Sequence, residues 1–343
     1  MNRHRVRIVG FVALTSLVVT VAAFAISPWP SAMLIRAVFT KDAADKSAAL
    51  EKHSPGGVRR IANENYGSGD PDTTFDVYVP ETATEALPTI VWAHGGAWIS
   101  GSKDDTVPYF ELLAEAGFTV VGINYSIGPE KQYPTAVTQY NDALAYLVKH
   151  ADRYNIDPER IVLAGDSAGS QLSSQVAALT TNPAYADFLG ITPALDPDQL
   201  RGVILNCGIY EMSLLTGGSG VIGWGIAMAM WAYTGERDAD NSDILAAMST
   251  MRHVTSEFPP AFISGGNGDE LTESQSRPLA EKLTGMGVDV TTLFWPEDLE
   301  PALPHEYQFV LDNPEGQKAL TDMIAFARLV TDDGPGWSAT TEG

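Results

Sequence analysis

Short apolar segments alternate with helix-like segments along most of this chain, and this alternation limits the folds that it can adopt. The segments with the apolar character of buried strands are 75–79, 88–93, 118–124, 160–164, 200–207, 260–264 and 290–295. The segments with helical patterns are 107–117, 136–154, 168–179, 272–285 and 315–330. Apolar strands that are separated by helices indicate a mostly parallel sheet with helices on both faces. We therefore predict an α/β fold with a mostly parallel central sheet flanked by helices.

Two segments interrupt this alternation. Residues 31–74 combine a short apolar helix at 32–39 with a polar connector, and we expect them to form a cap or connector. Residues 208–255 contain an apolar, methionine-rich run, which is either a lid over a pocket or an ordinary buried helix. The predicted organisation is therefore an N-terminal segment at 1–30, a connector at 31–74, a main domain at 75–331 with its insertion at 208–255, and a flexible tail at 332–343.

The N-terminal segment has the pattern of an export signal. Arg3, Arg5 and Arg7 precede residues 8–26, which carry no charge and would span roughly 28 Å as a helix, close to the thickness of a bilayer core. The arginines predict a cytoplasmic N-terminus and an exported main domain. The segment is then an uncleaved membrane anchor, or a signal peptide cleaved after the small-x-small sequence at 23–25. A buried core helix is the third alternative.

Charge and composition exclude several functions. The chain has 21 basic and 43 acidic residues and a net charge of −22, which disfavours nucleic acid as a partner. A single cysteine, Cys207, excludes an intrachain disulfide and a cysteine metal cluster. The sequence has no His-x-x-x-His pair, phosphate-binding glycine loop or dinucleotide fingerprint, so we predict no metal and no cofactor. The composition does not indicate an oligomeric state.

A serine between glycines is the first candidate for chemistry. Residues 165–169 read Gly-Asp-Ser-Ala-Gly, directly after the apolar run 161–164 and before a helical pattern. A strand that turns this sharply into a helix leaves little room for side chains, and the two glycines relieve the crowding. The hydroxyl of Ser167 is then expected at the carboxyl edge of the sheet and at a helix N-terminus. This position suits a nucleophile.

A second glycine motif is a candidate oxyanion site. Gly95 and Gly96 follow a predicted strand, and their N–H groups can point into a cleft that no side chain blocks. With the N–H of Ala168 they would form a hole with three donors. We expect His94 to hold this loop by hydrogen bonding and Trp98 to pack at the cleft wall. A plain Gly-Gly turn is the alternative.

These motifs are similar to those of the α/β-hydrolases, specifically the hormone-sensitive-lipase-like esterases. The run 165–169 resembles their nucleophile turn, residues 94–96 resemble their oxyanion loop, and residues 125–130 resemble the segment after their next strand. The resemblance covers residues 75–330. Ala97 stands where many members have a third glycine, so the loop is expected to be slightly stiffer.

The resemblance implies a triad in the chain order Ser, Asp, His. Only His253 and His305 follow Ser167, and only His305 also follows Asp269, which lies in a loop similar to the family's acid loop. We therefore expect Asp269 to be the acid and His305 the base. The acidic, proline-rich segment 296–304 makes their separation longer than is usual in the family.

The predicted function is therefore that of a serine hydrolase that cleaves short- to medium-chain carboxylic esters through an acyl-enzyme. Ser167 attacks, His305 moves the proton, and the N–H groups hold the oxyanion. An exopeptidase or amidase with the same triad, and a ligand-binding module without catalysis, are the alternatives. Trp98, Trp224 and Met228 are the predicted wall of the substrate pocket, and Glu270 is the alternative acid.

Overall fold

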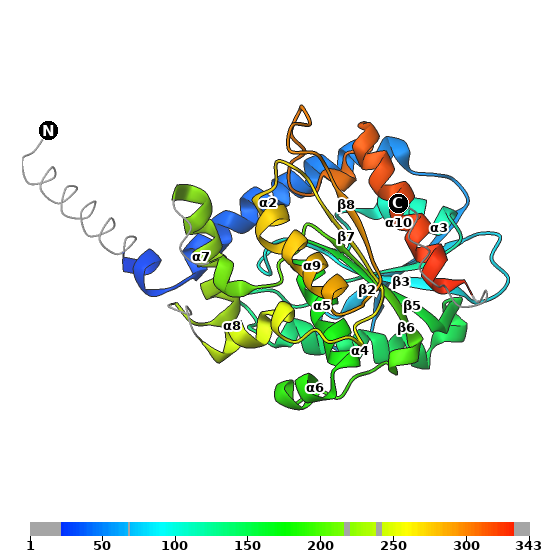
Figure 1. Ribbon diagram of the computed structural model, residues 1–343, viewed down its shortest axis with the longest axis horizontal. Coiled ribbons are helices and arrows are strands. Elements are labelled where there is room, and N and C mark those ends of the chain that lie inside the picture. Colours follow the sequence, from blue (N-terminus) through cyan, green and yellow to red (C-terminus); the bar gives the residue numbers. More distant parts are fainter. Residues whose placement is uncertain (1–21, 68, 216–219, 238–241, 333–343) are drawn as a thin grey trace, which may run out of the picture.

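The computed structural model describes residues 22–67, 69–215, 220–237 and 242–332 and contains a single eight-stranded sheet (Figure 1). Along the sheet the strands follow the order β1-β2-β4-β3-β5-β6-β7-β8. The strands are β1 (Val58–Asn65), β2 (Thr74–Pro80), β3 (Leu87–Ala93), β4 (Thr119–Ile123), β5 (Ile156–Asp166), β6 (Leu200–Asn206), β7 (Ala261–Gly265) and β8 (Val290–Phe294).

The sheet is mostly parallel, which confirms the fold predicted from the apolar strands. Strands β4, β3, β5, β6, β7 and β8 pair in parallel, whereas β2 pairs antiparallel with both β1 and β4. The sequence pattern missed β1, so the sheet begins at Val58 rather than at residue 75. β1 is an edge strand with mostly half-exposed and exposed side chains, and therefore lacks the apolar pattern of a buried strand.

Helices cover both faces of the sheet because side chains alternate along each strand. Val91 of β3 belongs to one buried cluster with residues of the helices α4 (Thr135–Lys149), α5 (Ala168–Thr181) and α9 (Arg277–Gly285). Its neighbours Ile90 and Trp92 pack on the other face with α3 (Val107–Glu115) and α10 (Pro314–Thr331). The shorter helical elements are η1 (Glu51–His53), η2 (Ala151–Arg153), α6 (Pro183–Leu189), η3 (Pro197–Gln199), η4 (Met212–Leu214), α8 (Asp243–Met248), η5 (Thr250–Arg252), the π-helical turn η6 (Thr272–Ser276) and η7 (Tyr307–Phe309).

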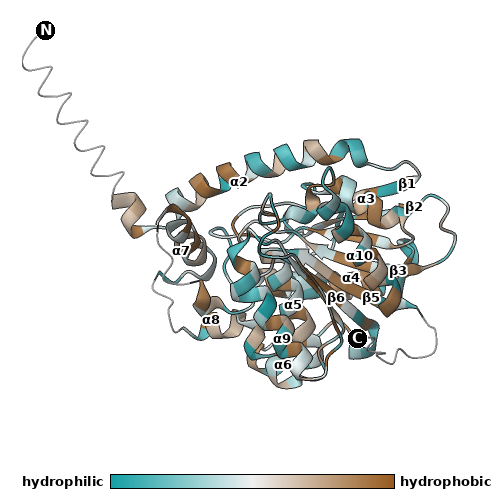
Figure 2. Cartoon of the chain, turned by 45° about the horizontal axis from the view of Figure 1, so that its top comes forward, coloured by the Kyte–Doolittle hydropathy of each residue, from teal (hydrophilic) through white to brown (hydrophobic). Residues whose placement is uncertain are grey.

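Two helices outside these layers form a cap. Helix α2 (Trp29–Leu50) runs along one edge of the molecule between α7 (Gly220–Thr234) and α3 (Figure 2). It is much longer than the short helix predicted at 32–39. Small residues of α2 and α7, including Ala32 and Ala229, pack together. Arg36 of α2 donates to the carbonyl oxygens of Ile99 (2.6 Å) and Gly128 (2.7 Å), which fixes α2 to the loops at the carboxyl edge of the sheet.

The predicted N-terminal signal lies largely outside the described residues. Residues 8–21 of the apolar segment 8–26 are not described, and neither is the predicted tail beyond residue 332. Within the described ranges, no helix combines the length and the apolar character that crossing a bilayer requires.

Candidate active site

Ser167 occupies a sharp turn between β5 and α5. Its backbone has φ 51° and ψ −118°, a conformation that side-chain-bearing residues rarely adopt. The flanking glycines are needed because a side chain at either position would clash with the backbone. A Cβ atom on Gly169 would lie 2.0 Å from the carbonyl oxygen of Ala93, and one on Gly165 would lie 2.4 Å from the carbonyl carbon of Gly169. The N–H of Ser167 donates to the carbonyl oxygen of Asn206 on β6 (2.9 Å). The turn therefore holds the hydroxyl at the carboxyl edge of the sheet.

His305 and Asp269 are joined by a short hydrogen bond. The His305 Nδ1–H donates to Asp269 Oδ2 (2.7 Å), and the other carboxylate oxygen accepts the N–H of Leu271 (3.0 Å). Burial lowers the pKa of His305, but its neighbours Cys207 and Asp269 raise it by more, so that it lies well above its ordinary value. The bond at Nδ1 leaves Nε2 as the atom that can exchange a proton with a hydroxyl group.

Asp269 and His305 come together although 296–304 intervenes, because Asn267 ties that segment to the acid loop. The Asn267 side chain donates to the carbonyl oxygen of Leu299 (2.9 Å) and accepts the N–H of Leu303 (2.8 Å). The N–H of Gly268 donates to the carbonyl oxygen of Leu303 (2.9 Å). A Cβ atom on Gly266 would lie 2.3 Å from that oxygen, so glycine is needed for this close approach.

The alternative base, His253, and the alternative acid, Glu270, have no hydrogen bond to His305 or Asp269 among the described residues, although Glu270 lines the cavity beneath α7. A ring nitrogen of His253 donates to the carbonyl oxygen of Ala246 (2.8 Å), and its ring stacks on Tyr185 with centroids 4.0 Å apart. Glu270 is exposed. The structure thus brings together Asp269 and His305, as the chain order predicts.

The oxyanion loop differs from its prediction at Gly95. The Gly95 N–H donates to Asp166 Oδ2 (2.8 Å) and is therefore not free to hold an oxyanion. In the described part of the chain, no acceptor is found for the N–H groups of Gly96, Ala97 and Ala168. Gly96 (φ 108°) and Ala97 (φ 52°) have left-handed backbones. These three N–H groups are the candidate donors, and Ala97 is the one that sequence reasoning missed.

His94 fixes this loop, as predicted. Its neutral ring donates from Nδ1 to the Gly95 carbonyl oxygen (2.8 Å) and stacks on Tyr125 with centroids 4.3 Å apart. Burial lowers the pKa of His94 to about 4, so the ring stays neutral at physiological pH. Tyr125 in turn donates its hydroxyl to the carbonyl oxygen of His94 (2.6 Å).

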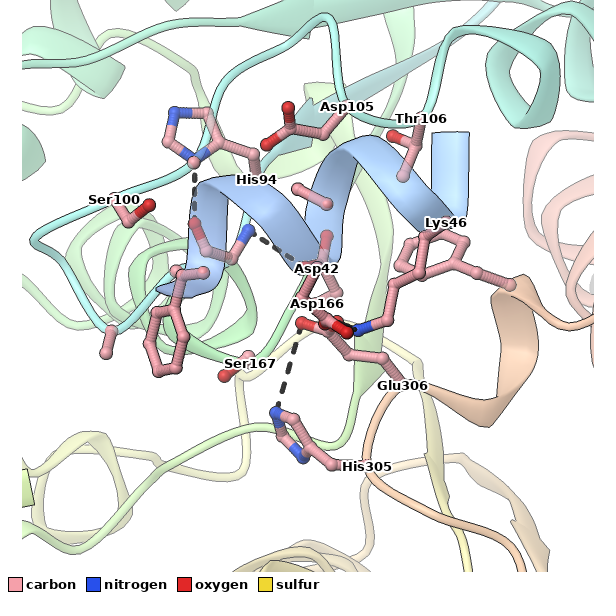
Figure 3. Close-up of a pocket in the computed structure, with 17 residues that line it drawn as sticks. Asp42, Lys46, His94, Ser100, Asp105, Thr106, Asp166, Ser167, His305 and Glu306 are labelled. Carbon is pink, nitrogen blue, oxygen red and sulfur yellow. Dashed lines mark hydrogen bonds and ion pairs between the residues drawn. The ribbon is translucent and has the colours of Figure 1, made fainter. Parts of the chain in front are cut away.

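Ser167 and His305 line two cavities, although no hydrogen bond joins the two side chains in the structure. Such bonds are commonly long without substrate and tighten when it binds. The first cavity, of about 180 Å³, lies beneath α2 and is lined by polar and charged side chains, among them Lys46, Asp105, Asp166 and Glu306 (Figure 3). The second, of about 360 Å³, lies beneath α7, and its apolar lining is Ala97, Trp98, Ile209, Leu215, Ile222, Ile226, Ala229 and Leu271.

The predicted pocket residues are only partly found at these cavities. Trp98 lines the apolar cavity and stacks on Tyr233 with centroids 5.4 Å apart. Trp224 is 40% exposed, and Met228 packs with the cluster between α2 and α7. Among the described residues, neither of them lines either cavity, and other residues of α7, including Ile226, take that place. Trp98 thus lines one of the two cavities as expected, and a role of Trp224 and Met228 in binding substrate stays a prediction.

One group in the site also has the composition of a metal-binding cluster. Ligand atoms of Cys207, Asp269 and His305 lie within 4.8 Å of one another. Burial raises the pKa of the Cys207 thiol, whereas a metal ligand must be a thiolate. Asp269 and His305 are already hydrogen-bonded to each other, so the group fits an acid–base pair better than a metal site.

A serine on a strand-to-helix turn, followed along the chain by an aspartate and a histidine on loops of the same parallel sheet, defines an α/β-hydrolase fold. The BD-FAE family model matches residues 75–283, and the chain belongs to this family. The resemblance seen in the sequence motifs is thereby confirmed at the level of fold and family.

Curated relatives with detectable similarity include esterases. Esterase LipQ of Mycobacterium tuberculosis is 29% identical over 261 residues, which cover 72% of this chain and 59% of that protein. An acetyl esterase of Salmonella paratyphi B is 39% identical over 103 residues, which cover 30% of this chain and 31% of that protein. The chain thus spans less than two thirds of the length of either relative.

Solved structures of esterases share the fold. Esterase B from Lactobacillus rhamnosis has a TM-score of 0.77 at 23% identity, with 89% of this chain and 96% of that chain covered. An esterase from Pyrobaculum calidifontis has a TM-score of 0.68 at 22% identity, with coverage of 88% and 94%. A bacterial heroin esterase has a TM-score of 0.67 at 21% identity, with coverage of 87% and 91%.

Proposed function

We propose that this protein is a serine hydrolase that acts on carboxylic esters. The observation that carries the proposal is the 2.7 Å bond between His305 Nδ1 and Asp269 Oδ2 beside two cavities that Ser167 also lines. Such an arrangement orients an imidazole as a base for a serine hydroxyl. The esterase relatives support an ester rather than an amide as the substrate.

The proposed reaction has two stages with a covalent intermediate. Ser167 Oγ attacks the ester carbonyl carbon while His305 Nε2 takes its proton, and the negative carbonyl oxygen accepts hydrogen bonds from Gly96, Ala97 and Ala168. The carbon–oxygen bond to the alcohol then breaks, and His305 returns the proton to the leaving alcohol. In the second stage water attacks the acyl carbon and gives a proton to His305; the bond to Ser167 Oγ then breaks, His305 returns the proton to Oγ, and the carboxylic acid leaves.

The cavity beneath α7 supports a preference for short- to medium-chain acyl groups. It has about 360 Å³ and an apolar lining, which suits an alkyl chain because each buried methylene contributes about 0.8 kcal/mol. The net charge of −22 disfavours docking on anionic lipid, so soluble esters are the expected substrates rather than long-chain lipid at an interface.

We also propose that the catalytic domain is exported. This proposal rests on the sequence alone: three arginines precede the uncharged segment 8–26, which serves as a signal peptide or as an anchor. Protease added outside sealed spheroplasts is expected to digest the domain, and full protection of the domain would overturn the proposal. N-terminal sequencing of the mature chain distinguishes cleavage from anchoring.

The decisive experiment compares esters with amides in wild type and variants. We expect turnover of p-nitrophenyl acetate, butyrate and octanoate, little turnover of palmitate, and none of peptide amides. A fluorophosphonate probe should label Ser167, and Ser167→Ala should lose both labelling and turnover, whereas Ser256→Ala, at an exposed serine, should keep both. Faster turnover of amides would overturn the ester assignment. A folded wild type with neither turnover nor labelling would indicate a ligand-binding module.

A further inference from the structure

A buried and a partly buried carboxyl group contact each other beside the catalytic centre. Asp166 precedes Ser167, and its oxygens accept the Trp92 Nε1–H (2.7 Å) and the Gly95 N–H (2.8 Å). Glu306 follows His305, and its carboxyl group contacts that of Asp166. Burial and the neighbouring Glu306 raise the pKa of Asp166 well above its ordinary value, whereas His305 and Lys46 lower that of Glu306 despite its burial, so the negative charge of the pair is favoured on Glu306.

A lysine from the cap balances that charge. Lys46 lies on α2, 260 residues away from Glu306 in the chain, and its Nζ is 2.7 Å from Glu306 Oε2 (Figure 3). A second carboxylate, Asp42 on the same helix, lies 2.8 Å from Nζ. Burial lowers the pKa of Lys46, but Glu306 and Asp42 raise it by more, so the ammonium group stays charged.

The Glu306 carboxylate is close enough to the His305 ring to affect its charge, but it is too far away to form a hydrogen bond with Nε2. Its Oε1 is 3.9 Å from His305 Nε2, the atom that must receive the proton of Ser167. The backbone of Glu306 has φ 61°, in the left-handed region that glycine or asparagine usually fills. A carboxylate free to move would close on a protonated Nε2, because a charge-assisted hydrogen bond is favourable there. In the structure Glu306 does not close on Nε2, since its other oxygen is bound to Lys46.

We propose that Lys46 and Glu306 are positioning residues for His305: Lys46 holds the Glu306 carboxylate where it stabilises the imidazolium without occupying Nε2. This inference rests on the proposed function, in which Nε2 exchanges protons with Ser167. The cap helix α2 then supplies part of the active-site electrostatics as well as covering the cavity. The same network reaches the oxyanion loop, because Asp166 contacts Glu306 and accepts the N–H of Gly95.

The charge of His305 depends on titratable and charged groups from several elements, which surround His305 and Glu306. They are Asp269 after β7, Cys207 after β6, Asp166 at the end of β5, Asp105 before α3, and Lys46 and Asp42 on α2. Opposite charges within about 4–6 Å commonly shift a pKa by about one unit or more. Glu306→Gln removes a negative charge beside Nε2 and should lower the pKa of His305 by about one unit. Lys46→Met removes a positive charge and frees Glu306 to bind Nε2, and should raise that pKa by about as much.

The experiment measures the pKa of His305 by NMR titration of its ring protons, with the His305→Gln spectrum used only to assign the signals. Glu306→Gln and Lys46→Met should shift this pKa in opposite directions. In parallel, Lys46→Met should reduce kcat/KM at pH 7 about tenfold, and Lys46→Arg should restore most of it. The double variant Lys46→Met/Glu306→Gln should behave like Glu306→Gln alone, because the carboxylate that Lys46 restrains is then gone. The matched control is Lys41→Met, at an exposed lysine of α2 that pairs with Asp45.

The outcomes separate this inference from the proposed function. The inference would be overturned if Glu306→Gln and Lys46→Met left the pKa of His305 unchanged or shifted it in the same direction, and only lowered the melting temperature. Ester hydrolysis would still stand in that case. The inference would also be overturned if the effects of Lys46→Met and Glu306→Gln simply added in the double variant. If wild type turns over no ester, the proposed function fails, and the NMR titration still tests whether Lys46 and Glu306 set the charge of His305.

Discussion

Replacing Asp269 by asparagine is expected to abolish the proposed ester hydrolysis while leaving the fold intact, because the hydrogen bonds of the Asp269 carboxylate fix the orientation of the new amide. Asp269 Oδ1 accepts the N–H of Leu271 (3.0 Å), so the amide oxygen of the variant has to take that place. The amide NH₂ group then takes the position of Oδ2, which in the wild type lies 2.7 Å from His305 Nδ1. A donor at that position requires Nδ1 to accept, which moves the proton of the neutral ring to Nε2. The base is then protonated at the atom that should receive the proton of Ser167.

The expected loss follows from this change of tautomer. A triad with the wrong tautomer loses about 10⁴-fold in kcat, equivalent to about 5.4 kcal/mol in the activation free energy. Stability should fall by only about 1 kcal/mol, because a hydrogen bond to a charged partner is replaced by a neutral one. The assay is kcat on p-nitrophenyl butyrate, together with urea denaturation. Glu297→Gln, at an exposed carboxylate that lines neither of the two cavities, is the matched control and should stay within about twofold of wild type. An Asp269→Asn variant that keeps more than a tenth of wild-type kcat would refute the tautomer argument.

The remaining predictions concern pH, substrate size and stability. The pKa of His305 is raised above 6.5, and His305 must be neutral to act as a base. We therefore expect kcat/KM to increase with pH with an apparent pKa above 6.5. An apparent pKa below about 6 would contradict this. Ile226→Trp should reduce turnover of octanoate far more than that of acetate, whereas Trp224→Ala should leave the acyl-length profile unchanged; equal losses for both esters would show that Ile226 does not line the acyl site. Lys103→Met should cost about 2 kcal/mol in urea unfolding, because it removes a buried charge-assisted contact of 2.9 Å to Asp76 and leaves Arg60 to balance that carboxylate; an unchanged midpoint would argue against a stabilising ion pair.

The layers of the fold could be predicted because buried strands have an unmistakable apolar pattern. The same reasoning failed for β1, whose outward side chains are polar at a sheet edge, and for the length of α2. The second half of α2 is polar and faces a charged cavity through Asp42 and Lys46, so no apolar stripe marks it as a helix.

The candidate site could be predicted where spacing along the chain carries the information. Chain order alone selects Asp269 and His305, which the structure joins by a hydrogen bond. The partnership of Lys46 with Glu306 could not be found, because residues so far apart meet only after folding. Gly95 was misassigned because its N–H depends on where the Asp166 carboxylate lies. Helix α7 is apolar on nearly every side, so its pattern could not tell which residues face the cavity.

The ties made by Asn267 give the segment between β8 and His305 an unusual freedom to change. Leu303, two residues before His305, is bound to the acid loop on both its N–H and its carbonyl oxygen. Residues 296–298, which precede the Leu299 carbonyl oxygen that Asn267 also binds, are exposed, so their length and composition can vary while the histidine stays in register with its acid. Doubling such a loop costs only about 0.6 kcal/mol in closure entropy. The exposed residues of this loop can therefore be replaced or extended to contact new ligands at the rim of the site, while Asp269 and His305 keep their positions.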